Sequence, residues 1–188
     1  SHGRSFYLNL QQLLNWDRTF NFKHHVSVLL GHEWYKSTGV SLGAQKSKMF
    51  SLENTELGGA VIDMQSASSG YSEYNNEGYF LRAQYDYENR IFASASFRRD
   101  ASSRFHPDHR WGNFWSAGAG WLMDREPWFD IWWVDLLKLK ASIGSQGNDG
   151  IPDYLYTDTY EVSNNEGEVA VVFRTKGNHD ITWEGQST

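Results

Sequence analysis

Cysteine is missing from this sequence altogether, so neither a disulfide framework nor a thiolate-bound metal is available to it. No run of 18 apolar residues occurs, which excludes a transmembrane helix but not strands that cross a membrane. Positive charge is in deficit, with 17 Lys and Arg against 23 Asp and Glu and a net charge of −6. We therefore expect no nucleic-acid partner, because such binding usually leaves a basic patch.

The common catalytic motifs are absent as well. The sequence has no Gly-x-Ser-x-Gly elbow, no Walker loop and no His-Glu-x-x-His pair. His32-Glu33 is followed by Trp34-Tyr35-Lys36, so the second histidine of the zinc motif is missing. Paired carboxylates for glycoside chemistry are defined by a distance in space, so the sequence does not test them. We expect neither catalysis nor a cofactor.

Two polar clusters resemble metal-ligand sets without matching them. His106 and His109 flank a Pro-Asp pair, but Arg104 and Arg110 stand beside them and no third ligand follows at a zinc spacing. A solvated loop with polar turn residues explains this cluster better. We predict no metal there.

The second cluster consists of Asn148, Asp149 and Asp153, whose oxygens suit calcium. Their spacing does not match an EF-hand loop, which also ends in a glutamate. An Asn-Asp-Gly turn accounts for the same residues, so we predict a turn rather than a calcium site.

Aromatic residues are abundant, at 16% of the chain, although the mean hydropathy is only −0.63. Many rings with little aliphatic mass fit a protein whose apolar surface is a band rather than a filled core. The same composition also fits a secreted β-sandwich that binds carbohydrate on aromatic platforms. The length is compatible with one domain.

The stretch from Glu77 to Met123 alternates with period two in three segments, which predicts three strands. One predicted face carries Tyr79, Leu81, Ala83, Tyr85 and Tyr87, then Ala93, Ala95 and Phe97, then Trp115, Ala117, Ala119 and Trp121. The opposite face carries Phe80, Arg82, Gln84 and Asp86, then Ser94, Ser96 and Arg98, then Ser116, Gly118 and Gly120. The apolar face is thin in the middle and aromatic at its ends.

Further strands are predicted on both sides of this stretch, at 4–17, 25–45, 137–146 and from Ile181 onward. Two long polar stretches, 46–76 and 147–180, read as outer loops, the second with a local hairpin of 154–162 and 168–174. The segment 124–136 breaks the alternation and is expected to hold one helical turn at an interface, where Trp is favoured.

Short and long connections thus alternate along the chain, as in an up-and-down membrane barrel with its tight turns on one side. A soluble antiparallel sheet with one wet face also alternates, and a sandwich of two sheets has no such rule for its loops. The direction in which the apolar side chains of the strands point distinguishes a membrane barrel from a sandwich. A barrel places one set of apolar residues on a single outer surface, whereas a sandwich buries the same set between sheets: Leu8, Leu10, Val28, Leu81, Ala95, Ala117 and Leu139.

The run 97–105, Phe-Arg-Arg-Asp-Ala-Ser-Ser-Arg-Phe, resembles a signature of the SusC/RagA-type TonB-dependent transporters of Bacteroidetes. The neighbouring segments 78–87, 111–121, 137–149 and 181–184 match the same family in the same order. The signature residues that we carry over are Phe97, Arg98, Arg99, Asp100, Ser102, Ser103, Arg104, Phe105, Trp111 and Gly112.

The resemblance implies an all-β fold in which antiparallel up-and-down strands form part of a large transmembrane β-barrel of about 22 strands, with long extracellular loops. It implies that residues 1–188 are a fragment of one barrel domain without the plug, and both chain ends look cut. It also implies an outer-membrane importer of oligosaccharides or peptides, with outer-membrane lipid, a SusD-like surface lipoprotein and TonB as partners.

Polar residues on the predicted inner face are the candidate substrate contacts. If the apolar face meets lipid, then charges on the other face line the lumen, where they are tolerated and can select what passes. Pairing with one another or with the plug is the alternative role for each of them. The candidates are Arg82, Gln84, Arg98, Asp100, Lys138, Lys140 and Gln146.

Overall fold

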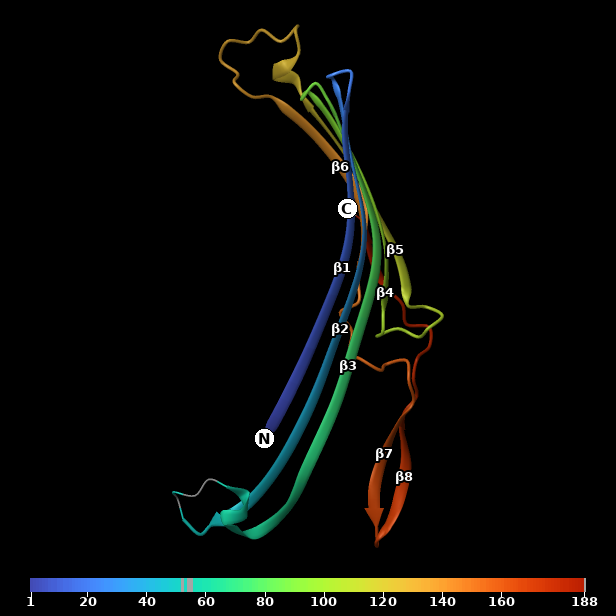
Figure 1. Ribbon diagram of the computed structural model, residues 1–188. Helices are drawn as coiled ribbons and strands as arrows, with labels where there is room; N and C mark the ends of the chain where they lie inside the picture. The colour runs from blue at the N-terminus through green and yellow to red at the C-terminus, as the bar shows by residue number, and fades with distance from the viewer. Residues whose placement is uncertain (52, 54–55, 188) are drawn as a thin grey trace. The chain divides into compact units, whose positions relative to one another are not determined.

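The computed structural model describes residues 1–51, 53 and 56–187, which form nine strands and two short 3-10 turns (Figure 1). None of the helical segments in this described part is long and apolar enough to cross a membrane. The strands are β1 (His2–Phe20), β2 (His24–Met49), β3 (Ala60–Tyr87), β4 (Ile91–Ser102), β5 (Trp111–Leu122), β6 (Lys138–Asn148), β7 (Thr159–Asn165), β8 (Glu168–Thr175) and β9 (Glu184–Ser187). The 3-10 turns are η1 (Leu57–Gly59) and η2 (Met123–Arg125).

Seven strands form one sheet in the order β1-β2-β3-β4-β5-β6-β9, and β7 pairs with β8 in a separate hairpin. The pairs β3–β4, β4–β5, β5–β6 and β6–β9 are all antiparallel. The seven-stranded sheet thus follows the chain order, which is the up-and-down arrangement predicted from the alternation.

The chain divides into two compact units. The first comprises Ser1–Asn9 and Tyr35–Asn75, and the second comprises Leu10–Trp34 and the chain from Asn76 onward. The second unit contains all of β4, β5, β6 and β9, together with the parts of β1, β2 and β3 that carry residues 10–20, 24–34 and 76–87. The family-signature residues all lie in this unit, so the site is built from it alone.

Tight turns join the strands at three places, each with two successive residues of positive φ. These are Asn21 and Phe22 (51° and 59°), Glu88 and Asn89 (50° and 55°), and Glu166 and Gly167 (54° and 96°). Two positive φ values in a row define the type I′ turn, whose twist matches that of the paired strands. The predicted short connections after Asp17 and Glu88 are therefore confirmed as two-residue hairpins.

The prediction of an outer loop over 46–76 is wrong for most of its length, because β2 continues to Met49 and β3 begins at Ala60. Serine, glycine and asparagine made this stretch read as a loop. In the first unit these small residues face one another across strands: a Cβ added at Gly39 would lie 2.8 Å from the hydroxyl oxygen of Ser72. Cross-strand fit has overridden the low intrinsic strand preference of these residues.

Three further sequence predictions for the fold are close to the structure. The 3-10 turn η2 is the turn expected within the aromatic stretch after Leu122. The local hairpin exists as β7–β8, a few residues later than predicted on its first strand. Strand β9 pairs with β6, so the chain returns to the sheet after Trp183.

The burial of the side chains distinguishes this sheet from one layer of a β-sandwich. Among the described residues only Ala60, Ala101, Phe105 and Leu122 are buried hydrophobic side chains. Residues that a sandwich would enclose are exposed instead: Leu10 by 48%, Leu81 by 41% and Leu139 by 61%. The β-sandwich alternative is therefore wrong, because no second sheet covers these apolar side chains in the described part of the second unit.

Candidate functional site

The register of the paired strands sorts the side chains of the second unit onto two faces. Leu81 lies opposite Phe97, and Ala95 lies opposite Ala117. Residues directly opposite each other project to the same face of a sheet. The apolar face therefore contains Leu81, Ala83, Ala93, Ala95, Phe97, Trp115, Ala117, Ala119, Leu139, Ala141 and Ile143, as the alternation predicted.

Aromatic residues close this apolar face at both ends. At one end the Tyr79 ring stacks on His32 and on Trp111, with centroids 4.6 and 6.1 Å apart. At the other end Nδ1 of His24 lies 2.8 Å from the Tyr85 hydroxyl, and the His24 ring lies 5.0 Å from Tyr87. We call the apolar-face residues from Tyr79 to Tyr87, together with the residues on the same face of the adjoining strands, the apolar band.

The size of the apolar band fits a membrane. Tyr87 lies eight positions after Tyr79, which is about 26 Å along a strand at ~3.3 Å per residue. At a strand tilt of about 40° this corresponds to ~20 Å of thickness, near the ~25 Å apolar belt of outer-membrane barrels. Aromatic girdles bound that belt on both sides in such barrels. The rings around Tyr79 and Tyr87 occupy the corresponding positions.

The opposite face is polar and built from small residues. Gln84, Ser94, Gly118 and Ser142 form one row across four strands, and the Ser96 and Ser116 hydroxyl oxygens lie 2.7 Å apart in the next row. Long polar side chains rise at its edges. Arg82 stands opposite Ser96, Lys140 stands opposite Gly120, and the Lys138 ammonium lies 5.0 Å from the Phe92 ring centre.

A charged group stands on the same polar face nearer the long connections. The Nε of Arg98 donates to both carboxylate oxygens of Asp100, each at 2.7 Å, and one of its terminal nitrogens lies 3.5 Å from Glu33. Gln11 donates to the other Glu33 oxygen at 3.3 Å. Arg98 and Asp100 are thus paired with each other, which was the alternative role considered for these candidates.

The second half of the signature ties two long connections together. Ser102 is fully buried and donates to Asp149 at 2.8 Å. Arg104 donates through Nε to Asp153 at 2.9 Å and through Nη1 to the Asp149 carbonyl at 2.9 Å. The oxygens considered as calcium ligands are therefore hydrogen-bond acceptors. We call Ser102, Arg104, Phe105, Asp149, Asp153 and Trp183 the loop clasp.

Aromatic packing completes the loop clasp. Phe105 has no exposed surface, and its ring centre lies 5.3 Å from that of Trp183. Trp183 also packs on Phe114 at 5.2 Å and donates its indole N–H to the Arg110 carbonyl at 2.8 Å. A Cβ at Gly147 would overlap the Phe114 ring, so glycine is required there for packing.

The remaining signature residues have other positions. Phe97, Arg99 and Trp111 lie on the apolar face, where the Arg99 guanidinium stands 5.0 Å above the Trp111 ring. A Cβ at Gly112 would lie 2.9 Å from Trp183, so the absence of a side chain at Gly112 leaves room for the Trp183 ring. Ser103 follows β4 in the connection to β5, outside the loop clasp as defined. Gln146 pairs with Gln186 across β6 and β9.

The predicted histidine cluster does not gather metal ligands. The His106 ring stacks on His179 at 4.6 Å and its Nδ1 lies 3.4 Å from Asp108. Within the described residues no group of three histidine or carboxylate side chains is placed to hold a metal ion.

The tight-turn end holds a network that the sequence reading missed. Lys23 pairs with Glu88 at 2.8 Å, Glu88 also pairs with Arg90, and Arg90 pairs with Glu126 at 2.9 Å. Trp121 donates its indole N–H to Glu126 at 2.9 Å. The hydrogen bond between Lys23 and Glu88 raises the pKa of the lysine and lowers the pKa of the glutamate. We call Lys23, Glu88, Arg90 and Glu126 the turn clamp.

These features define a class of protein: an all-β chain whose antiparallel sheet has one lipid-compatible band and one polar face, as in the wall of a membrane β-barrel. Comparison with known proteins gives the family. No family model matches the sequence. The chain is 28% identical over 183 residues to TonB-dependent receptor P39 of Formosa agariphila, covering 93% of the chain and 17% of that receptor.

The TonB-dependent receptor SusC of Bacteroides thetaiotaomicron is also similar, with 33% identity over 119 residues, covering 58% of the chain and 12% of that receptor. The chain therefore spans less than a fifth of the length of these curated relatives.

Solved structures agree with the sequence relatives. The RagAB peptide importer in its closed-closed state matches with a TM-score of 0.92 and 26% identity, covering 98% of this chain and 21% of that chain. Its open-open state matches with a TM-score of 0.90. The resemblance to SusC/RagA-type TonB-dependent receptors is confirmed, and so is the fold, a section of an antiparallel β-barrel. The bacterial outer membrane is confirmed as its location.

Proposed function

We propose that this chain is one section of the barrel domain of an outer-membrane TonB-dependent importer of oligosaccharides or peptides. The observation that carries the proposal is the division of one sheet into an apolar band between aromatic rings and a polar face of small residues. Strands β1 and β9 lie at the two edges of this sheet. Open edges are not tolerated in lipid, so neighbouring strands of the same barrel domain pair with them.

The polar face is then the lumen wall. Its small residues leave room beside the sheet, and its long polar side chains stand where a polar solute or the barrel plug passes. In this proposal Arg82, Gln84, Lys138 and Lys140 contact the passing solute or the plug, since no carboxylate among the described residues pairs with Arg82, Lys138 or Lys140. Arg98 and Asp100 instead hold each other in place, and Gln146 supports the β6–β9 pair.

The partners follow from the same proposal. A SusD-like surface lipoprotein covers the side of the long connections, and TonB acts through parts of the receptor outside this section. The similarity to a receptor named SusC and to an importer named RagAB supports this pairing. The substrate passes without any bond being made or broken, so the section is no enzyme.

A transport measurement distinguishes a peptide substrate from an oligosaccharide substrate. Cells that express the full-length receptor with its lipoprotein are given labelled peptides or labelled oligosaccharides, and uptake is compared with that of cells lacking the receptor. We expect receptor-dependent uptake of one of the two classes. Uptake of neither class would contradict the proposed cargo.

Cysteine labelling tests which face of the sheet contacts lipid, because this section contains no cysteine of its own. Ala117→Cys and Ser116→Cys are neighbours on β5 that project to opposite faces. In the full-length receptor in vesicles, a fluorophore at position 117 should be quenched by brominated lipid, and one at position 116 should not. Equal quenching at both positions would contradict the assignment of the two faces.

A further inference from the structure

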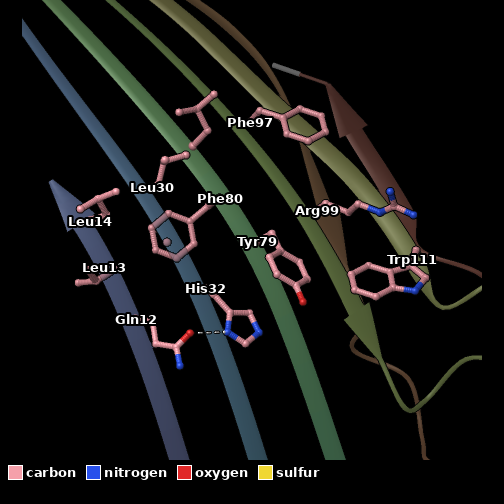
Figure 2. Close-up of a pocket in the computed structure, with 12 residues that line it drawn as sticks. Gln12, Leu13, Leu14, Leu30, His32, Tyr79, Phe80, Phe97, Arg99 and Trp111 are labelled. Atoms are coloured by element: carbon pink, nitrogen blue, oxygen red, sulfur yellow. Dashed lines mark hydrogen bonds between the residues drawn. The ribbon is translucent and has the colours of Figure 1, made fainter. Parts of the chain in front are cut away.

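The sheet in the second unit is hollowed on both faces. On the apolar face, beside Tyr79, the hollow is lined mainly by carbon, as Leu14, Leu30 and Phe97 illustrate (Figure 2). On the polar face a hollow of about 540 Å³ lies nearer the tight turns, and β2, β3, β4, β5 and β6 all contribute to it. Charged and hydrogen-bonding side chains line this polar hollow, so it suits a polar ligand.

The floor of the polar hollow consists largely of small side chains. One row across the sheet contains Gln84, Ser94, Gly118 and Ser142, and the next row toward the tight turns contains Asp86, Phe92, Gly120 and Lys140. The two glycines have no side chain and the serines rise little above the sheet, which leaves space over these strands. Hydroxyl and amide groups both donate and accept hydrogen bonds. Such a floor suits the N–H and C=O groups of a peptide backbone.

The β6 side of the polar hollow is cationic. Lys140 stands opposite Gly120, and Lys138 leans across β5, with its ammonium 5.0 Å from the Phe92 ring centre. Its Cε lies 3.5 Å from the position that a Cβ at Gly120 would take. Both lysines are exposed, and neither has a carboxylate partner among the described residues. A ligand carboxylate placed here meets two ammonium groups, which form strong charge-assisted hydrogen bonds with it.

The β3 side of the polar hollow carries the opposite charge. Asp86 lies in the same row as Lys140 but three strands away, which is about 14 Å at ~4.8 Å per strand. Its Oδ1 accepts the N–H of Asn89 at 2.7 Å, and no cation of the described residues forms an ion pair with it. His25 also lines this side and lies 3.2 Å from Asp17. This side therefore favours a ligand cation and opposes a second ligand carboxylate.

We propose that the polar hollow binds an extended peptide of about four residues, with its C-terminal carboxylate at Lys138 and Lys140 and its N-terminal ammonium at Asp86. An extended chain of about four residues spans ~14 Å, which matches the separation of the two charged sides. Charge complementarity favours a peptide over an oligosaccharide, because a neutral sugar chain offers neither charge. The inference rests on the proposed function, since it needs the polar face to line the lumen, and it narrows the proposed cargo to peptides.

The test measures initial uptake of radiolabelled tetra-alanine by cells that express the full-length receptor with its lipoprotein, after subtraction of uptake by cells lacking the receptor. The same peptide with an amidated C-terminus or an acetylated N-terminus provides two capped probes. We expect the free peptide to enter about threefold to fivefold faster than either capped probe, as one partly exposed ion pair gives. These ratios do not depend on how much receptor reaches the membrane.

Each charged side has its own variant. Replacing both lysines, Lys138→Gln with Lys140→Gln, should abolish the discrimination against the amidated peptide. Asp86→Asn should abolish the discrimination against the acetylated peptide, while its amide oxygen can still accept the Asn89 N–H. Lys176→Gln is the matched control, because it removes an exposed lysine outside the hollow and should leave both ratios unchanged.

Unchanged ratios in the lysine and Asp86 variants would overturn the peptide site. An equal change in the uptake of free and capped peptides would also overturn it, because these side chains would then hold the barrel plug instead of recognising the charged ends of the cargo. Uptake of oligosaccharides without uptake of peptides would overturn only this inference. Uptake of neither class would overturn the proposed cargo as well.

Discussion

The two ends of the sheet in the second unit are stabilised by different interactions. At the tight-turn end, Lys23, Glu88, Arg90 and Glu126 form the turn clamp from ion pairs in which Lys23 is exposed and the other three side chains are partly exposed. At the other end, the loop clasp is organised around Phe105, which has no exposed surface. Exposed ion pairs contribute little free energy, whereas a buried ring contributes several kcal/mol.

The largest expected effect comes from emptying the loop clasp. Phe105→Ala should destabilise the 103–110 and 149–183 connections by about 3–5 kcal/mol, because it leaves a cavity beside Trp183. Hydrogen exchange of these two segments in the full-length receptor measures the change. Phe22→Ala, at a fully exposed position in the turn between β1 and β2, is the control and should leave both segments unchanged. Unchanged exchange in Phe105→Ala would refute the buried role of this ring.

A smaller effect should follow from overfilling the same end. Gly147→Ala places a methyl group inside the volume of the Phe114 ring, which should cost about 1–3 kcal/mol as the ring moves. Gly185→Ala on the neighbouring strand is the matched control, since a Cβ there meets nothing within 4 Å. Chemical unfolding of the two variants compares them directly. Equal loss of stability in both would show that strand glycines, and not the Phe114 contact, determine the cost.

The turn clamp should respond more weakly. Glu88→Gln removes the negative charge shared by Lys23 and Arg90, so exchange at the turns 21–23 and 88–90 should rise while the loop clasp is unaffected. The folded pKa of Glu88 lies below 4.5, so its contribution is present above pH 4.5 and is lost as the pH falls below that value. The difference between variant and parent should therefore disappear in acid. A difference that persists in acid would exclude the ionic origin.

The smallest effect is expected in the first unit, outside the apolar band. Glu73 accepts hydrogen bonds from Lys36 at 2.7 Å, Tyr71 at 2.5 Å and Asn75 at 2.9 Å, which lower its pKa from 4.5 to about 2. Its folded pKa is depressed, so its contribution is present above pH 4.5 and lost as the pH falls through 2. Thermal melting of Glu73→Gln should differ from the parent at pH 6, and this difference should shrink as the pH falls from 4.5 towards 2. A difference that stays constant over this range would contradict the ionic role of Glu73.

The sequence predicted much of the second unit because alternation alone decides which residues share a face. Leu81, Ala95, Ala117 and Leu139 fall on one face in the structure, as their spacing required. The stretch 46–76 was misread because Ser-rich and Gly-rich strands look like loops until their cross-strand partners are known. The sequence located the signature, but the resemblance alone did not say that Ser102 and Arg104 bind the connection after β6.

By itself, the sequence determined the strand pattern, the two faces and the family resemblance, because period-two alternation is a local property of the chain. The tertiary structure alone decided the partners of the charged residues. It paired Arg98 with Asp100, Arg104 with Asp153 and Lys23 with Glu88, and it left Arg99 beside the apolar band on the ring of Trp111. The reason is physical: the energy of a charge depends on which groups lie within a few ångströms, and that distance is set only when distant strands pair.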